Sequence, residues 1–233
     1  MSIFDLGERF LEFLTKVNVG DFRLAEDLPD VDKYDIAIVE GTPITKQNVK
    51  RLKEVRKKSK ILVTIGACAT MGGVQEIKDY RGDKKKLIRT IYPNIRGIDN
   101  PNIKSVKEIV KVDLEIPGCP INKEEFFRLI NQVLKGTIPE IPQNPVCDEC
   151  IRRNKNCLIL LGKPCLGAIS LAGCGAPCPA AGFLCDGCRG PRKGINLEAM
   201  KSALKIKARL SEDEIKNLLE RFGKLNELYA NKN

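Results

Sequence analysis

Eight of the chain's ten cysteines lie between Cys147 and Cys188. They are Cys147, Cys150, Cys157, Cys165, Cys174, Cys178, Cys185 and Cys188. Eight thiols divide into two sets of four, and four thiolates are a complete ligand set for an iron–sulfur cluster or a structural zinc ion. This stretch therefore predicts two tetrathiolate sites, which the rest of the chain must position.

Disulfides are the first alternative for these thiols, and the rest of the sequence argues against them. The N-terminal run MSIFDLGERFLEFL has charged residues inside its apolar pattern, unlike a signal peptide. No apolar run approaches the roughly 18 residues of a transmembrane helix. We therefore expect a cytoplasmic chain without membrane insertion, in which clustered cysteines bind metal.

The spacing of the cysteines favours iron–sulfur clusters over zinc. Zinc sites commonly combine two C-x2-C pairs and often include histidine, and this chain has no histidine. Two such pairs exist, Cys147/Cys150 and Cys185/Cys188, but the four cysteines between them are unevenly spaced. A cluster accepts thiolates from scattered loop positions. Glycines that would let the backbone approach its sulfides stand at Gly173, Gly175, Gly182 and Gly187. Zinc remains the alternative.

The first 140 residues alternate short apolar runs with helical patterns. Strands are expected at 34–39, 61–65 and 112–116, and helices at 3–16, 46–58 and 123–135. The face of the last helix that we expect to be buried consists of Phe126, Phe127, Ile130, Val133 and Leu134. Short apolar strands separated by helices predict an α/β fold with a parallel sheet covered on both faces.

The two remaining cysteines, Cys68 and Cys119, each follow an expected strand in a glycine-bearing loop. Ligands of open parallel sheets lie beyond the carboxyl ends of the strands. We therefore expect these two thiols to converge on one edge of the sheet. The alternative is that both are small buried hydrophobic residues, and the adjacent glycines favour a site.

The proline-rich segment 138–145 predicts a linker, and helices with capping residues at Asn196 and Ser211 follow the cysteine stretch. The expected domains are a sheet domain over 1–140, a two-cluster domain over 141–192 and a C-terminal helical tail over 193–233. The formal net charge is +10, but the lysines are mixed with glutamates and aromatic residues make up only 5%. This pattern excludes nucleic acid as the expected partner.

Several motifs together resemble the small subunit of nickel–iron hydrogenases. They are VDKYDIAIVEGTP, TIGACATMGG, EIPGCP and the eight-cysteine stretch that closes on RGP. The likeness covers about residues 1–190 and is to the cytoplasmic multimeric kind, such as sulfhydrogenase delta subunits and the matching subunits of methanogen hydrogenases. It implies a flavodoxin-like domain that holds a proximal 4Fe-4S cluster, followed by a small loop-rich domain with a medial and a distal cluster, and then C-terminal helices.

The resemblance also implies ligands, matched by the order of the cysteines. The distal 4Fe-4S cluster would take Cys147, Cys150, Cys157 and Cys165. The medial 4Fe-4S cluster would take Cys174, Cys178, Cys185 and Cys188. Cys68 and Cys119 match two proximal ligands, and Glu40 matches a glutamate after a family strand, where it either joins cluster or proton chemistry or binds loop amides.

The sequence departs from the family at its N-terminus. The other two proximal ligands form a C-x-x-C after a strand that precedes the helix expected at 3–16, and neither appears here. We expect the true start to lie upstream of Met1, which would restore a third cluster. Otherwise Cys68 and Cys119 form half a site.

The resemblance implies an oxidoreductase subunit that relays electrons and has no catalytic residues of its own. Its partners would be the hydrogenase large subunit, where dihydrogen is split, and a flavin or ferredoxin-type electron-transfer subunit. The alternatives are a standalone iron–sulfur electron carrier and a zinc-stabilised assembly module.

Overall fold

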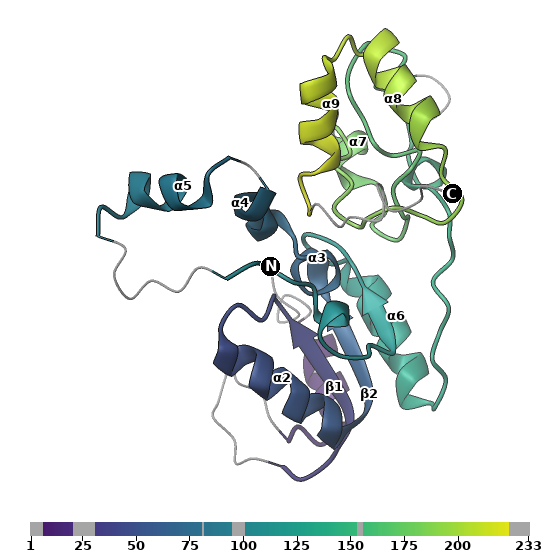
Figure 1. Ribbon diagram of the computed structural model, residues 1–233. Coiled ribbons are helices and arrows are strands. Elements are labelled where there is room, and N and C mark those ends of the chain that lie inside the picture. The colour runs from purple at the N-terminus through teal and green to yellow at the C-terminus, as the bar shows by residue number, and fades with distance from the viewer. Residues whose placement is uncertain (1–6, 21–30, 81, 95–100, 153–155, 224–233) are drawn as a thin grey trace.

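The computed structural model describes residues 7–20, 31–80, 82–94, 101–152 and 156–223. These residues form two lobes, which an extended connection joins (Figure 1). We call the part before residue 137 the sheet lobe and the part after residue 144 the cysteine lobe.

A parallel three-stranded sheet forms the centre of the sheet lobe. Its strands are β1 (Tyr34–Glu40), β2 (Ser59–Ile65) and β3 (Leu114–Ile116), in the order β1-β2-β3. In the register of the sheet, Ile65 pairs with both Glu40 and Ile116, so the carboxyl ends of all three strands meet at one edge. The expected parallel α/β fold is confirmed.

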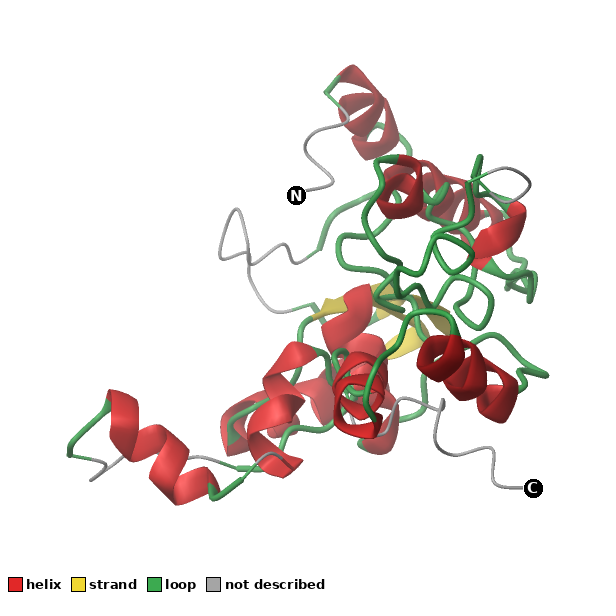
Figure 2. Cartoon of the chain, turned by 90° about the horizontal axis from the view of Figure 1, so that it is seen from above, coloured by secondary structure: helices red, strands yellow, loops and turns green. Residues whose placement is uncertain are grey.

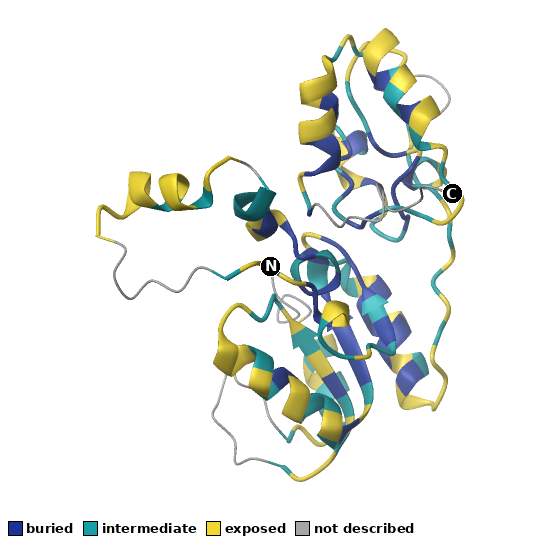
Figure 3. Cartoon of the chain, viewed as in Figure 1, coloured by how far each residue is buried: buried dark blue, intermediate teal, exposed yellow. Residues whose placement is uncertain are grey.

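Helices cover both faces of this sheet. The helices on one face are α1 (Glu8–Leu14) and α6 (Lys123–Leu134), and those on the other are α2 (Lys46–Lys58), α3 (Gly66–Met71) and the 3-10 helix η3 (Val106–Glu108). Because side chains alternate along a strand, β2 serves both faces: Leu62 packs with Leu52 of α2, whereas Val63 packs with Phe126 of α6. β2 is buried along most of its length (Figure 3).

Two details of the expected helices differ from the structure. α1 begins at Glu8 because Gly7 has a φ of 52°, so residue 7 precedes the helix, and residues 3–6 of the expected helix lie outside the described part. Leu134, expected to be buried, is 40% exposed, because it is the last residue of α6 and the buried cluster on this face of the sheet ends with Val133. The prediction for Leu134 was therefore wrong.

The segment between β2 and β3 had no clear pattern, and the structure gives it short helices. They are η2 (Val74–Glu76), α4 (Ile77–Tyr80) and α5 (Lys84–Ile91). α5 has no buried residue and stands away from the sheet and from the cysteine lobe in two perpendicular views (Figures 1 and 2).

The cysteine lobe consists of loops held by short helices. Its helices are η4 (Val146–Asp148), α7 (Pro177–Ala180), α8 (Leu197–Ile206) and α9 (Glu212–Leu219), the last two capped by Asn196 and Ser211 as expected. Leu166 and Ile169 pack against Leu204 of α8 and Leu219 of α9. The C-terminal helices therefore share one core with the cysteine loops.

The chain returns to the sheet lobe after α9. The hydroxyl of Tyr80 donates a hydrogen bond to the carbonyl of Glu220. Gly223 lies against the Met71 carbonyl, at 2.5 Å from where a Cβ on this glycine would stand. Within the described ranges, no helix is long and apolar enough to cross a membrane.

Candidate metal centre

Cys68 and Cys119 lie together at the carboxyl edge of the sheet. β2 leads directly into α3, which carries Cys68 in its first turn, and Cys119 follows β3 by three residues. The amide of Ala67 donates to the carbonyl of Gly118 at 2.9 Å and so joins the two loops. Burial raises the pKa of Cys119, and the nearby Cys68 sulfur raises it further. The parallel topology thus converts two distant cysteines into neighbours.

A tight backbone approach confines the Cys68 sulfur. Its Sγ lies 3.2 Å from the side-chain oxygen of Gln75, to which it donates a hydrogen bond. A Cβ on Gly73 would stand 2.9 Å from the same sulfur, and Gly73 has a φ of +69°. Only glycine fits both the conformation and the space.

Four cysteine side chains of the cysteine lobe surround one small cavity of about 50 Å³. The cysteines that line it are Cys147, Cys150, Cys157 and Cys165. η4 brings the first two together, since the amide of Cys150 donates to the carbonyl of Cys147 at 3.3 Å. A Cβ on Gly167 would lie 3.4 Å from the Cys147 sulfur and 3.6 Å from the Cys165 sulfur. The structure therefore gathers the four thiols that the resemblance assigns to the distal cluster.

The other four cysteines of this lobe gather around Cys188. Burial raises the pKa of Cys188, and the sulfurs of Cys174, Cys119 and Cys178 raise it further, which places all three nearby. α7 carries Cys178. Burial raises the pKa of Cys185 to about 12, with smaller contributions from Cys165 and Cys188. Cys185 also lies close to the first group, since it packs in one cluster with Cys150, Cys165 and Cys174.

Backbone amides connect the successive thiol groups. The amide of Cys185 donates to the sulfur of Cys165 at 3.5 Å, and the carbonyl of Cys185 accepts from the amide of Leu166 at 2.9 Å. At the other junction, the amide of Cys119 hydrogen-bonds the Cys188 sulfur and partly opposes the effect of burial on its pKa. These contacts join the loop of Cys119 at the sheet edge to Cys188, and Cys185 to Cys165 at the cavity of the cysteine lobe.

Two charged side chains of opposite sign flank Cys174. Glu149 accepts hydrogen bonds from the amides of Gly173 at 2.8 Å and Gly175 at 2.9 Å. Burial raises the pKa of Cys174, Glu149 raises it further, and the guanidinium of Arg189 lowers it. This thiol therefore responds to a local field that the sequence motifs did not reveal.

The donor set fits iron–sulfur clusters. Soft thiolates are the normal ligands of such clusters, and metal binding displaces the proton even from a thiol whose pKa burial has raised. Among the described side chains, no three Cys, Asp or Glu residues stand close enough to hold a metal ion as the chain stands. The ligand roles of the ten cysteines therefore stay predictions. Glu40 lies exposed at the end of β1, on the same edge as Cys68, and its role is likewise a prediction.

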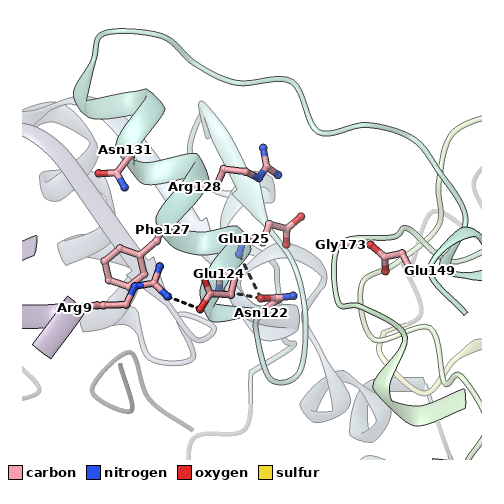
Figure 4. Close-up of a pocket in the computed structure, with 9 residues that line it drawn as sticks. All are labelled: Arg9, Asn122, Glu124, Glu125, Phe127, Arg128, Asn131, Glu149 and Gly173. Atoms are coloured by element: carbon pink, nitrogen blue, oxygen red, sulfur yellow. Dashed lines mark hydrogen bonds and ion pairs between the residues drawn. The ribbon is translucent and has the colours of Figure 1, made fainter. Parts of the chain in front are cut away.

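A larger cavity, of about 490 Å³, lies between α6 and the segment that carries Glu149 and Gly173 (Figure 4). No cysteine lines it. Its walls carry both signs of charge, with Arg9 and Arg128 near Glu124 and Glu125. This mixture of charges indicates no single class of small ligand, whereas the thiol groups indicate a metal.

Comparison with known proteins identifies the family. Residues 1–133 match the family described as NADH ubiquinone oxidoreductase, 20 Kd subunit. The chain belongs to this family. The predicted likeness to small subunits of nickel–iron hydrogenases is confirmed by individual relatives.

Two relatives and one solved structure show how far the similarity extends. The delta subunit of sulfhydrogenase 2 from Pyrococcus furiosus is 34% identical over 226 residues, which is 96% of this chain and 93% of the relative. The iron-sulfur subunit of the F420-non-reducing hydrogenase of Archaeoglobus profundus is 25% identical over 251 residues, covering 82% of this chain and 78% of the relative. A crystal structure of an NAD+-reducing [NiFe]-hydrogenase in its H2-reduced state aligns with a TM-score of 0.51 and 28% identity, over 60% of this chain and 85% of that one.

Proposed function

We propose that this chain is the iron–sulfur electron-transfer subunit of a nickel–iron hydrogenase complex. The relatives are named as subunits of hydrogenases, and one is named as an iron–sulfur subunit. The observation that carries the proposal is the placement of the thiols: Cys68 and Cys119 follow neighbouring strands at one edge of the sheet, and four more cysteines line one cavity in the cysteine lobe.

The proposed ligands follow the grouping of the thiols. Cys147, Cys150, Cys157 and Cys165 would hold one 4Fe-4S cluster, and Cys174, Cys178, Cys185 and Cys188 would hold a second. Cys68 and Cys119 would supply two ligands of a third group. Residues 1–140, 141–192 and 193–233 would correspond to the sheet domain, the two-cluster domain and the helical tail.

When bound, a 4Fe-4S cluster accepts and releases one electron at a time. The chain's own contribution is to hold the thiols in place and to shield some of them from water, since Cys185 is buried whereas Cys119 and Cys178 are exposed. Leu166, buried completely in the core that α8 and α9 close, anchors the loop that carries its neighbour Cys165. Rigid placement matters because electron tunnelling falls off exponentially with distance.

The placement of the thiols suggests where partners would bind. The large subunit, where dihydrogen is oxidised to two protons and two electrons, would meet the edge that carries Cys68 and Cys119. A flavin or ferredoxin-type subunit would meet the cysteine lobe beside Cys157. Both of these partners are part of the proposal.

Anaerobic purification of the full chain tests the proposal. We expect about eight irons and about eight acid-labile sulfides per chain from two cubanes, with a paramagnetic signal on reduction. Cys157→Ser should remove one cluster and Cys178→Ser the other, while Cys68→Ser should leave both. Copurification of a nickel-containing protein would support the hydrogenase, and clusters without such a partner would indicate a standalone carrier. A colourless protein that contains zinc and no iron would refute the proposal.

A further inference from the structure

Arg189 forms a buried connection between the two lobes. Its side chain is 2% exposed and follows Cys188 directly in the sequence. Both of its terminal nitrogens donate to the carboxylate of Glu125 on α6, at 2.7 Å and 2.9 Å. The Arg189–Glu125 pair thus has the two-pronged geometry that gives strong, directional ion pairs.

The same guanidinium also holds three backbone carbonyls. Nη1 donates to the carbonyl of Pro117 at 2.7 Å, and Nε donates to the carbonyls of Ala172 at 2.9 Å and Leu171 at 3.2 Å. Pro117 belongs to the loop that carries Cys119, and Ala172 to the loop that carries Cys174. One side chain therefore fixes loops that hold thiols of two different groups.

The backbone is shaped to admit this pair. Glu125 points from α6 toward the segment of Glu149 and Gly173 (Figure 4). A Cβ on Gly173 would stand 2.2 Å from a Glu125 oxygen and 2.4 Å from an Arg189 nitrogen. The glycine that the sequence suggested would approach a cluster thus lies against the ion pair.

The charge of Arg189 lies close to the second group of thiols. Its Nε donates to the carbonyl of Ala172, two residues before Cys174, and its own backbone follows Cys188 directly. Glu125 itself is 6% exposed, burial raises its pKa, and the bonds from Arg189 oppose that rise. A buried cation therefore lies beside the second thiol group, with its counter-charge on the other lobe.

From this geometry we propose that the positive charge of Arg189, held in place by Glu125, raises the reduction potential of the cluster bound by Cys174, Cys178, Cys185 and Cys188. The proposal rests on the proposed function. Reduction adds one electron to that cluster, and the redox partner that supplies the electron is oxidised by one electron. A fixed positive charge stabilises the reduced form, because that form carries one more negative charge. Arg189 therefore raises the potential, and Glu125 partly offsets it.

Opposite charge changes at the two ends of the pair give opposite expected shifts. Arg189→Gln removes the cation and should lower one midpoint potential, with about a tenfold fall in the reduced-to-oxidised ratio at fixed potential, or about 59 mV for one electron. Glu125→Gln removes the anion and should raise the same potential. The measurement is a redox titration of the anaerobically purified full chain, followed by electron paramagnetic resonance.

Arg56→Gln is the matched control. Arg56 forms an ion pair with Asp113, whose carboxylate also accepts from the amide of Leu62, three residues before the end of β2 and so about 10 Å along the strand from the carboxyl edge. This variant should move neither potential. The cluster of Cys147, Cys150, Cys157 and Cys165 serves as an internal reference, because its potential should change less in every variant.

Arg189→Lys separates charge from packing, because it keeps the charge and loses most of the carbonyl bonds. We expect its potential to stay near that of the wild type. Shifts of the same sign in Arg189→Gln and Glu125→Gln, or a potential that Arg189→Lys changes as much as Arg189→Gln does, would overturn the proposal. Loss of the second cluster from all three variants, with folding intact, would also overturn it and would reduce Arg189 to a structural role. A wild-type chain without clusters would instead refute the proposed function.

Discussion

Removing either member of the Arg189–Glu125 pair should weaken the attachment of the two lobes strongly. Arg189→Met leaves the Glu125 carboxylate buried without its cation, and Glu125→Leu leaves the guanidinium buried without its anion. Removing one partner of a buried ion pair typically costs about 3–5 kcal/mol. Arg189→Met should cost the larger amount, because the carbonyls of Pro117, Leu171 and Ala172 also lose their donor.

The double variant decides whether the pair acts as a unit. Once Arg189 is gone, replacing Glu125 by leucine removes an unpaired buried carboxylate, so the second change should cost little or even stabilise. We expect the double variant to be less destabilised than the sum of the single variants by about 2–3 kcal/mol.

These differences in stability are measured from the rate of unfolding in denaturant. The loss of visible cluster absorption under anaerobic conditions reports that rate. A change of about 4 kcal/mol in stability corresponds to nearly a thousandfold change in the equilibrium constant for unfolding. The unfolding rate reports the share of that change that comes from contacts broken before the transition state of unfolding. Additivity of the single variants within about 0.5 kcal/mol would refute the reasoning, since it would mean that the two charges do not interact.

Three further predictions concern other parts of the chain. Burial alone would raise the pKa of Asp113, but hydrogen bonds from the Leu62 amide and from Arg56 outweigh it and hold that pKa below 3.8. The wild type should therefore be more stable than Asp113→Asn near neutral pH, and this difference in stability should disappear as the pH falls below 3.8. Stopped-flow pH jumps followed by circular dichroism measure it. Gly173→Ala should destabilise the chain by more than about 2 kcal/mol in the denaturant unfolding assay, because the new Cβ would meet a buried ion pair. Gly194→Ala, at an exposed glycine with positive φ, is the control for the effect of the left-handed backbone alone. Deletion of residues 193–233 should expose the core around Leu166 and release iron from the chain, and a truncated chain that keeps its full iron content would contradict this shared core.

The architecture of the sheet lobe could be predicted because local patterns decide it. The strands around Ile36, Val63 and Ile116 are apolar and short, and the topology of parallel strands brings their carboxyl ends to one edge. The meeting of Cys68 with Cys119 followed from that rule alone. Leu134 was misplaced because helical periodicity does not indicate where the packing along a helix ends.

The cysteine lobe was predictable in chemistry but not in shape. The count and types of the cysteines indicated two thiol quartets, yet the loops between them lack a repeating pattern from which contacts could be read. Arg189, Glu125 and Glu149 were missed for this reason, because each acts across a long sequence separation. The one available signal for Arg189 was a cation directly after a C-x2-C pair, which by itself also describes an exposed loop.

A polar connection suits this junction better than an apolar one. Apolar surfaces tolerate small slides, whereas a two-pronged ion pair with three carbonyl partners has a single favourable geometry. Such a pair adds little net stability over an apolar substitute of the same shape, because desolvation offsets most of its attraction. Its advantage is the fixed placement of the Cys119 loop against Cys188, and electron transfer depends on that distance far more steeply than folding stability does. The arrangement therefore makes sense if placement at the lobe junction, rather than strength, is what the chain requires there.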